Sequence, residues 1–335
     1  MENPNTMQIN SSVQVATAGE ALIDFIAHAD GRFEPCLGGA VYNLTRALAR
    51  QGVGTAYLNS LSRDRFGRQL AKGLQDDGVQ LAVPEPVVQV TSLAVVHLNE
   101  QGHPDYAFYR EGVADRATSA AALTQACTQF EDLSLVCTGA LALSPDDADI
   151  YLPWLASQRQ AGRTVVVDAN LRPSVMPNLD LYRRHVLTAL QYADVIKASD
   201  EDLQCLDLPG ANALDQARYL LRKSRASILA LTLGSEGAVL LTRHGQVFRA
   251  RELESLKVVD TVGAGDCFLA GLVTAMLAHK LPANWGSAPV SDPVAKDLVA
   301  SAIASASLCV MQRGCVPPTR AQVVERMAST ALVCA

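Results

Sequence analysis

The stretch Asp260-Thr261-Val262-Gly263-Ala264-Gly265-Asp266-Cys267-Phe268 runs directly into Leu269-Ala270-Gly271-Leu272-Val273-Thr274-Ala275-Met276-Leu277. The second part is small or apolar throughout and has no proline, which predicts a helix that is buried on most sides. The first part is the entry to that helix, where Gly263 and Gly265 can adopt positive φ and let the backbone approach a ligand. The backbone N–H groups from Gly263 to Asp266 would stand at the helix N-terminus, where they favour negative charge.

Asp266 places a carboxylate in the same turn as these N–H groups. Phosphoryl transfer to a hydroxyl needs both features, because the amides stabilise charge on the moving group and the carboxylate accepts the hydroxyl proton. Alternatively, Asp266 only complements the helix dipole, which is worth about 0.3–1 kcal/mol. The spacing alone leaves both interpretations open.

The composition excludes several functional classes. The chain has 335 residues, of which 49% are hydrophobic and 19% charged, as in globular proteins with a large core. Its formal charge of −6 argues against nucleic acid or an anionic membrane as the main partner. We expect no membrane span, because no run approaches about 18 apolar residues. Residues 1–12 are polar and are expected to form a disordered tail.

Eight cysteines are spread along the chain, and none forms a C-x-x-C pair. Their spacing therefore indicates neither a zinc site nor a thioredoxin motif. Most lie inside apolar runs, as small buried residues of a reducing compartment do. We expect a cytoplasmic protein without disulfides.

Short apolar runs alternate with helical stretches from about residue 130 onwards. Continuous apolar strands separated by helices predict a parallel sheet covered on both faces. Ligands of such sheets bind beyond the carboxyl ends of the strands, where Gly139, Asp168, Ser199 and Gly234 fall. The predicted strands are Leu133–Thr138, Thr164–Val167, Val195–Ala198 and Ile228–Leu233.

The first 130 residues have a different pattern. Strands are expected within Val13–Ile26 and Thr91–Arg110, and Gly38-Gly39 opens a helix on which Val41, Leu44 and Leu48 recur at helical spacing. The hairpins predict a small antiparallel lid, formed from about residues 20–36 and 91–112. We expect the lid to be appended to a single domain over residues 13–330.

The motif D-T-V-G-A-G-D-x-F at residues 260–268 resembles the C-terminal signature of the ribokinase (PfkB) family of sugar kinases. The resemblance extends over residues 15–325, with at least four motifs in the family's order. It implies a ribokinase-like three-layer α/β/α sandwich with a mostly parallel central sheet and a small β-sheet lid. It also implies that Asp266 is the catalytic base and that Gly263, Ala264 and Gly265 form an anion hole.

A second group of residues resembles the family's sugar site. Gly38, Gly39 and Asn43 match its N-terminal signature, and Asp24 matches a strand carboxylate that binds sugar hydroxyls in relatives. Glycines permit close backbone approach, and an amide both donates and accepts hydrogen bonds. Without the resemblance, the first motif would be read as a helix entry and Asp24 as an exposed strand residue.

Three further segments resemble the nucleotide and magnesium site. Asp168 begins D-A-N-L-R-P, which implies contact with phosphate-bound Mg²⁺ through water. Asp202 stands where the family has Glu, so it is either part of the magnesium water shell or a solvated helix start. Implied contacts to ATP come from Ser199, Thr232, Gly234, Gly237 and Gly265.

The segment around Gly314 resembles the loop that holds a monovalent cation in potassium-activated members, together with Asp260 and the carbonyl of Val262. Pro318 stands where ribokinase supplies a hydroxyl. We therefore expect K⁺ dependence weaker than is usual in the family.

The run Asp105–Arg110 resembles a fructokinase element on a lid strand, where Phe108 and Arg110 would share a face directed toward the sugar. The resemblance favours D-fructose, converted to D-fructose 6-phosphate. Arg110 could instead pair only with a surface carboxylate such as Asp115. The alternatives are a 2-keto-3-deoxygluconate kinase, another kinase of the family, and a catalytically silent sugar-binding regulator. A homodimer through the lid sheet is a further expectation.

Overall fold

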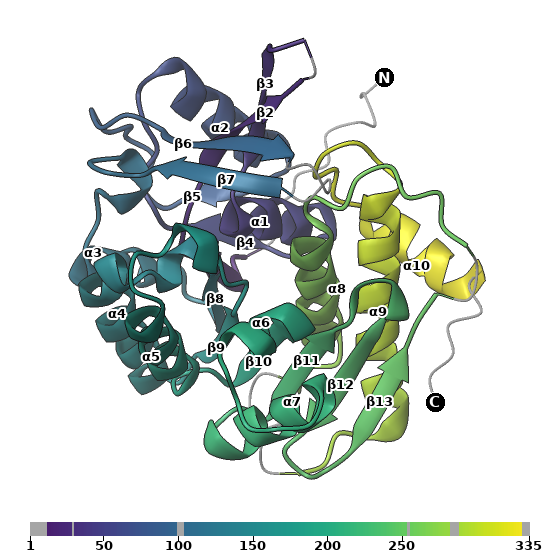
Figure 1. Ribbon diagram of the computed structural model, residues 1–335. Helices are drawn as coiled ribbons and strands as arrows, with labels where there is room; N and C mark the ends of the chain where they lie inside the picture. The colour runs from purple at the N-terminus through teal and green to yellow at the C-terminus, as the bar shows by residue number, and fades with distance from the viewer. Residues whose placement is uncertain (1–11, 29, 99–103, 253–254, 282–287, 330–335) are drawn as a thin grey trace, which may run out of the picture.

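The computed structural model describes residues 12–28, 30–98, 104–252, 255–281 and 288–329, so most of the predicted tail lies outside the described residues. These residues form a large sheet between two helical layers and a second, smaller sheet (Figure 1).

The large sheet has nine strands in the order β13-β12-β11-β10-β9-β8-β1-β4-β5. All neighbours pair in parallel except β12, which runs antiparallel to both β11 and β13. The four predicted strands are confirmed as β8 to β11, with ends that shift by one or two residues. The strands are β1 (Val15–Thr17), β4 (Thr55–Tyr57), β5 (Gln80–Leu81), β8 (Leu135–Gly139), β9 (Thr164–Asp168), β10 (Val195–Ser199), β11 (Ile228–Thr232), β12 (Ala238–Thr242) and β13 (Val247–Ala250).

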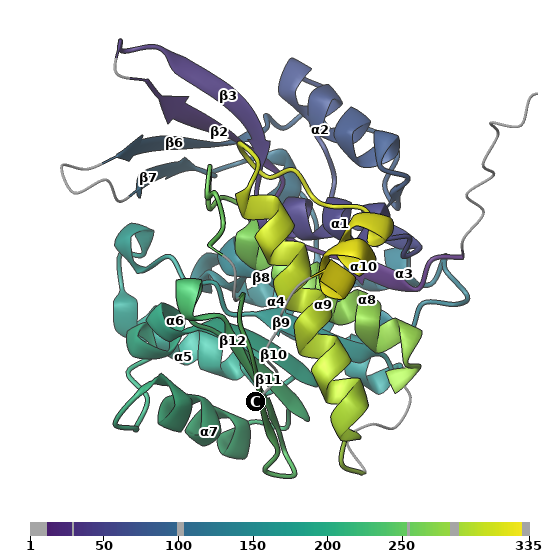
Figure 2. The same ribbon diagram turned by 90° about the vertical axis from the view of Figure 1, so that its right-hand side faces the viewer.

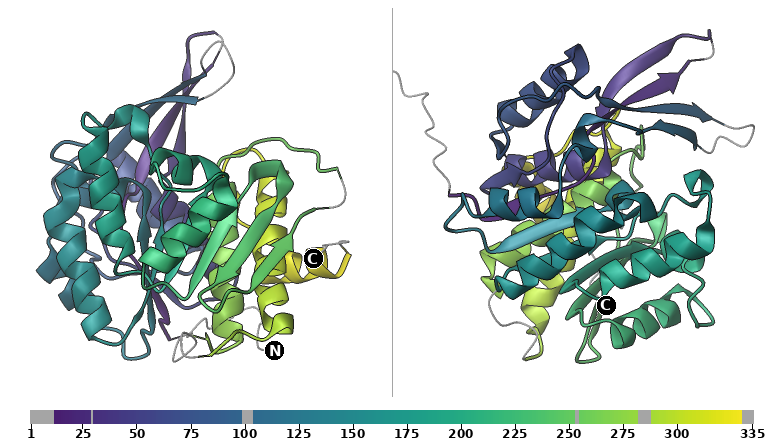
Figure 3. Two further views of the ribbon diagram at one scale, coloured as in Figure 1. Left: turned by 60° about the horizontal axis from the view of Figure 1, so that its bottom comes forward. Right: turned by 90° about the vertical axis from the view of Figure 1, so that its left-hand side faces the viewer.

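Helices cover both faces of this sheet, which is why its strands are continuously apolar (Figures 1 and 3). One face packs against α3 (Ala120–Cys127), α4 (Ala148–Gln160), α5 (Leu179–Leu190), α6 (Asp200–Cys205) and α7 (Ala213–Lys223). The other packs against α1 (Ala40–Arg50), α8 (Ala264–Ala278) and α9 (Asp292–Val310). Two helices lie further out, α2 (Arg65–Asp76) and α10 (Arg320–Ser329). Short 3₁₀ turns are η1 (Ala114–Arg116), η2 (Ala140–Leu143), η3 (Pro145–Asp147), η4 (Pro173–Val175) and η5 (Gly234–Glu236).

The helix α9 is long and apolar enough to meet a length-and-composition test for a membrane span. However, 61% of that window is buried inside the structure, where α9 packs against α8 and the large sheet. Its apolar character is that of a core helix.

The small sheet is the predicted lid, and it projects from one side of the core (Figure 2). Its order is β3-β2-β6-β7, formed by β2 (Leu22–Ala27), β3 (Phe33–Gly38), β6 (Ser92–Leu98) and β7 (Pro104–Tyr109). Each hairpin is antiparallel, but the central pair β2–β6 is parallel, so the prediction of an antiparallel lid is wrong for that pair. The intervening chain enters the large sheet as β4 and β5 before returning to the lid, which allows this parallel pairing.

The strand register aligns the predicted ligand-binding positions. Gly139 pairs with Asp168 across β8 and β9, and Ser199 pairs with Thr232 across β10 and β11. The carboxyl ends of these four strands therefore lie along one edge of the sheet, as predicted.

Candidate active site

The helix α8 begins in a conformation that favours glycine. Gly263 has φ 79°, and a Cβ there would lie 2.2 Å from Cys315 Sγ, so a side chain would be both strained and blocked. The N–H group of Ala264 donates to the carbonyl of Thr261 at 3.2 Å, which closes the turn. The next N–H groups, of Gly265 and Asp266, begin the helix and have no partner within it. These two N–H groups remain available to an anion, whereas the N–H group of Ala264 is used by the turn.

Asp266 is buried at the start of α8, and Asn43 Nδ2 donates to its Oδ2 at 2.9 Å. Asn43 comes from α1, so the contact joins two segments that are 223 residues apart in sequence. Burial raises the pKa of Asp266 to about 7, and the negative charge of Asp168 adds to this shift. Hydrogen bonding to Asn43 and the positive charges of Lys197 and Arg172 oppose it. The carboxyl group is therefore poised to accept a proton near neutral pH.

Asp266 and Asn43 line a cavity of about 520 Å³ between the lid and the core. The buried atoms Asn43 Oδ1 and Glu20 Oε2 have no hydrogen-bond partner in the described structure. The other oxygen of Glu20 accepts the N–H of Ala40 at 3.0 Å, at the start of α1. Unpaired buried acceptors are costly unless a ligand satisfies them, so this wall fits a molecule with several hydroxyl groups.

Asp24 lies in the same cavity beside the glycine pair. A Cβ at Gly38 would lie 2.0 Å from Asp24 Oδ2, so glycine is what lets this carboxylate rest against the backbone. Burial raises the pKa of Asp24 to about 6, and the positive charge of Arg172 limits the shift. Gly39 is the N-cap residue of α1, which confirms the predicted helix entry.

The lid contributes two aromatic rings to the cavity. Tyr106 and Phe108 lie two residues apart on β7 and stack with ring centroids 5.5 Å apart. Both line the cavity, and the Arg172 guanidinium lies 6.0 Å from the centroid of the Tyr106 ring. The stacked pair gives the cavity an apolar surface on the same face of the small sheet as Asp24, because Asp24 and Phe108 both align with Ala94 of β6.

A buried ion pair lies next to the start of α8. Lys197 Nζ donates to both oxygens of Asp168, at 2.8 and 2.9 Å. A Cβ on Gly265 would lie 3.0 Å from the same Nζ atom, so this cation borders the predicted anion hole. Burial raises the pKa of Asp168 to about 6 even though Lys197 lowers it. Lys197 was not among the predicted site residues; its place two residues before Ser199 in a buried strand was the available signal.

Asp202 is held in place by two backbone N–H groups. Its Oδ2 accepts the N–H of Ser199 at 2.8 Å, and its Oδ1 accepts the N–H of Leu171 at 2.7 Å. Ser199 Oγ in turn accepts the N–H of Asp202, which completes a capping box at the start of α6. In this structure the predicted magnesium and nucleotide residues Asp202 and Ser199 thus form a helix cap, and Asp202 is buried rather than solvated.

The turn after β11 contains the other predicted nucleotide residues. Thr232 ends the strand, Gly234 begins η5, and the N–H of Leu233 donates to the carbonyl of Gly237 at 2.8 Å. The turn lies at the same sheet edge as Ser199, so the structure brings these residues together there.

The predicted cation loop is also assembled. Asp260 Oδ1 accepts the N–H of Val262 at 3.0 Å, and Oδ2 accepts the N–H of Gly314 at 2.9 Å. All three residues line the cavity that contains Asp266.

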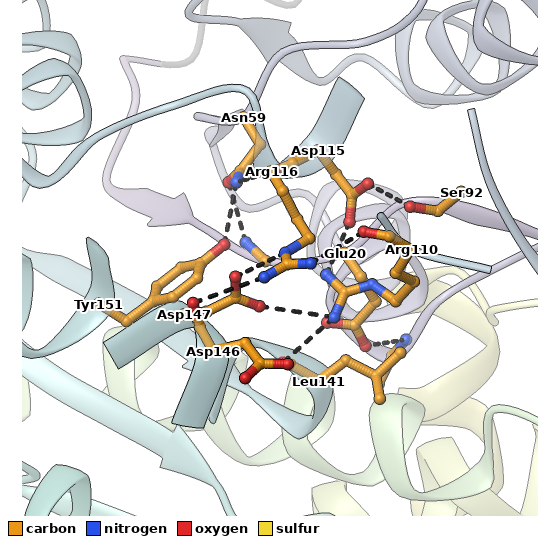
Figure 4. Close-up of polar contacts among 12 residues, drawn as sticks. Glu20, Asn59, Ser92, Arg110, Asp115, Arg116, Leu141, Asp146, Asp147 and Tyr151 are labelled. Atoms are coloured by element: carbon orange, nitrogen blue, oxygen red, sulfur yellow. Dashed lines mark hydrogen bonds and ion pairs between the residues drawn. The ribbon is translucent and has the colours of Figure 1, made fainter. Parts of the chain in front are cut away.

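Arg110 lies elsewhere than predicted (Figure 4). Its guanidinium lies 3.0 Å from Asp115 Oδ2 and 3.6 Å from Asp147 Oδ2, and both carboxylates are buried. It is absent from the lining of the Asp266 cavity but lines a neighbouring cavity of about 560 Å³ with Phe108. Burial disfavours its charge, yet Asp115, Asp147 and Glu20 together raise its pKa. Arg110 therefore does not line the Asp266 cavity. It pairs with Asp115, as the alternative prediction had it, but this carboxylate is buried rather than on the surface, and Asp147 of η3 joins the same network.

Comparison with known proteins places this geometry in a family. A family model described as pfkB family carbohydrate kinase matches residues 13–322. The chain belongs to this family of carbohydrate kinases. A fructokinase of Escherichia coli is 31% identical over 266 residues, which cover 79% of this chain and 85% of that protein.

Solved structures support the same fold. A fructokinase of Xylella fastidiosa with bound ATP is 25% identical with a TM-score of 0.80, covering 94% of this chain and 98% of that one. A fructokinase double mutant of Vibrio cholerae O395, solved with fructose, ADP and a potassium ion, is 24% identical with a TM-score of 0.77, covering 94% and 99%. This carbohydrate kinase therefore has the ribokinase-like α/β fold with a second small sheet.

Proposed function

We propose that this carbohydrate kinase transfers the γ-phosphoryl group of ATP to the primary hydroxyl of D-fructose, giving D-fructose 6-phosphate and ADP. The observation that carries the proposal is Asp266, a buried carboxyl group whose pKa is raised to about 7 at the start of α8. The relatives named as fructokinases, and those solved with ATP or with fructose and ADP, support the choice of substrates.

Each of these residues has a separate role in the proposed phosphoryl transfer. Asp266 accepts the proton of the attacking hydroxyl, whose oxygen forms a bond to the γ-phosphorus while the bond to ADP breaks. The first free N–H groups of α8 and the Lys197 ammonium lie where negative charge on the phosphoryl group would be stabilised. Asn43 orients Asp266 through its 2.9 Å hydrogen bond.

A magnesium ion, when bound to the phosphates, would neutralise their charge. Asp168 fits only a contact through water, because Lys197 occupies both of its oxygens. The oxygens of Asp260 and Val262 and the backbone of Gly314 would fit a monovalent cation such as K⁺, since a 2.9 Å hydrogen bond joins the Gly314 loop to Asp260 beside the cavity.

The charges of the cavity favour a neutral sugar. Glu20, Asp24 and Asp266 all line it, and each would repel the carboxylate of 2-keto-3-deoxygluconate whenever it is ionised. Arg172 is the cation among the described lining residues, and it already donates to Asn170 Oδ1 at 2.6 Å. The unpaired oxygens of Glu20 and Asn43 would instead accept hydrogen bonds from sugar hydroxyls.

A substrate panel tests the proposal. ADP release is measured with D-fructose, 2-keto-3-deoxygluconate and D-ribose, and the phosphorylated position is assigned by NMR. We expect the highest kcat/KM for D-fructose and a 6-phosphate product. A preference for 2-keto-3-deoxygluconate would overturn the substrate. Sugar binding without ADP release would instead identify a silent regulator.

A further inference from the structure

Three cysteines that are far apart in sequence meet beneath the start of α8. Cys267 belongs to the first turn of α8, Cys309 to the last turn of α9, and Cys315 to the loop after α9. Their three sulfur atoms lie within 4.8 Å of one another. All three are free thiols, and Cys267 and Cys309 are buried. The proposed kinase reaction uses none of these side chains.

The spacing of the sulfur atoms suits a thiophilic cation. A Zn²⁺ ion with Zn–S bonds of about 2.3 Å in tetrahedral geometry holds its sulfur ligands about 3.8 Å apart. The sulfur atoms lie within 4.8 Å of one another, so each sulfur–sulfur distance has to shorten by no more than about 1 Å to reach this geometry. Soft thiolate ligands select zinc, cadmium and monovalent copper over the hard cations that bind phosphates.

The cluster is also accessible and has room for a fourth ligand. Cys315 is half-buried and lines the Asp266 cavity, so an ion can enter from there. The carbonyl oxygen of Val262 lies 3.5 Å from Cys309 Sγ but belongs to the proposed K⁺ site. A water molecule from the cavity is therefore the candidate for the fourth ligand.

We propose that Cys267, Cys309 and Cys315 form a binding site for one thiophilic d¹⁰ cation of the Zn²⁺ class, and that its occupancy inhibits the kinase. Each thiol releases its proton to solvent as its sulfur binds, so a divalent ion and three thiols give a complex of charge −1 and three protons. This negative charge would lie against Gly263, whose missing Cβ is where Cys315 Sγ packs. It would therefore repel a phosphoryl group at the start of α8.

Spectroscopy on the full chain tests binding without using activity. The protein is kept reduced with a non-thiol phosphine and titrated with Cd²⁺, whose thiolate complexes absorb in the ultraviolet. We expect one equivalent to bind in the wild-type protein and binding to weaken as pH falls. The absorption should be lost in Cys315→Ala and in Cys309→Ala, which provide two independent variants if one folds poorly.

Cys36→Ala is the matched control, because Cys36 lines the same cavity but lies outside the cluster. It should keep the Cd²⁺ absorption and its stoichiometry. An absorption of equal strength in Cys315→Ala, or none in the reduced wild-type protein, would overturn the site.

Inhibition is then measured with Zn²⁺ at fixed magnesium and ATP. We expect at least about tenfold loss of rate in the wild-type protein and in Cys36→Ala, and much less in Cys315→Ala. Equal inhibition of all three would mean that Zn²⁺ acts on the nucleotide or elsewhere, and would overturn the inhibitory role. The Cd²⁺ titration still decides the site if D-fructose proves not to be the substrate, so the two proposals can fail separately.

Discussion

At the residue scale, the surroundings of Asp266 set the pKa of the proposed base. Burial and the nearby charge of Asp168 oppose ionisation, while Asn43 and Lys197 favour it. The balance leaves the pKa at about 7 rather than at the usual 3.8. A base with a pKa near the working pH combines a large deprotonated fraction with enough proton affinity to assist the attacking hydroxyl.

Arg110→Ala should destabilise the protein because it leaves the buried carboxylate of Asp115 without its cation and leaves Asp147 with Arg116 alone. Removing one partner of a buried ion pair typically costs about 3–5 kcal/mol. We expect a loss of this size in the free energy of unfolding, measured with urea. Lys72→Ala is the control, since its pair with Asp76 is exposed and should be worth less than about 1 kcal/mol. Similar small losses in both variants would contradict the structural role of the Arg110 network.

At the element scale, the start of α8 depends on one glycine. Gly263→Ala places a residue with a Cβ in a left-handed backbone conformation and also pushes that Cβ against Cys315. Gly245→Ala has the same backbone strain but no steric clash, because the space beside Gly245 is open. We expect Gly245→Ala to cost about 1–2 kcal/mol of stability and to retain turnover. Gly263→Ala should cost more and also lose most of its turnover. Equal kcat values in the two variants would contradict the role of this turn.

The contact between Asp260 and the loop at Gly314 gives a prediction about cations. The N–H groups of Val262 and Gly314 donate to Asp260 and hold it in place, and Pro318 supplies no side-chain hydroxyl. We therefore expect K⁺ to raise kcat by less than about tenfold. The measurement titrates KCl against choline chloride at constant ionic strength. A larger rise would show that the missing hydroxyl does not weaken the site.

The elements differ in how well the sequence predicts them. β8 to β11 could be predicted because strands buried on both faces are continuously apolar. The parallel β2–β6 pair could not, since hairpin patterns report local pairing only and these strands are joined through the large sheet. The capping box at Ser199 and Asp202 was open to prediction from its spacing, but a metal-shell motif uses similar residues.

At the scale of the whole molecule, the candidate site consists of residues that only the fold brings together. Its motifs could be located because each lies at a glycine turn or a strand end. Contacts over long sequence separations, such as Arg110 with Asp147, leave no local pattern. The cysteine cluster was missed for the same reason, because spacing rules recognise only ligands that are close in sequence.

The buried carboxyl groups also make the ligand-free protein sensitive to pH. Burial raises the pKa of Glu20 and Asp266 to about 7 and that of Asp24 and Asp168 to about 6. Between the unfolded and folded pKa values, the native state binds more protons than the unfolded state. The free energy of unfolding therefore falls as pH rises through this window. We expect the free energy of unfolding to be at least about 1.4 kcal/mol higher near pH 5 than near pH 8. Asp266→Asn should reduce the difference, and a protein more stable at the higher pH would contradict these shifts.

The most direct test of the central claim is the turnover of Asp266→Asn with D-fructose. The amide keeps the size of the side chain but cannot accept the hydroxyl proton, and loss of a general base typically costs about 10²–10⁴-fold in rate. We predict a fall in kcat of this size, with an unchanged Kd for ATP by calorimetry and a cooperative unfolding transition. Turnover within about threefold of the wild-type protein, equal to about 0.7 kcal/mol of barrier, would show that Asp266 is not the base.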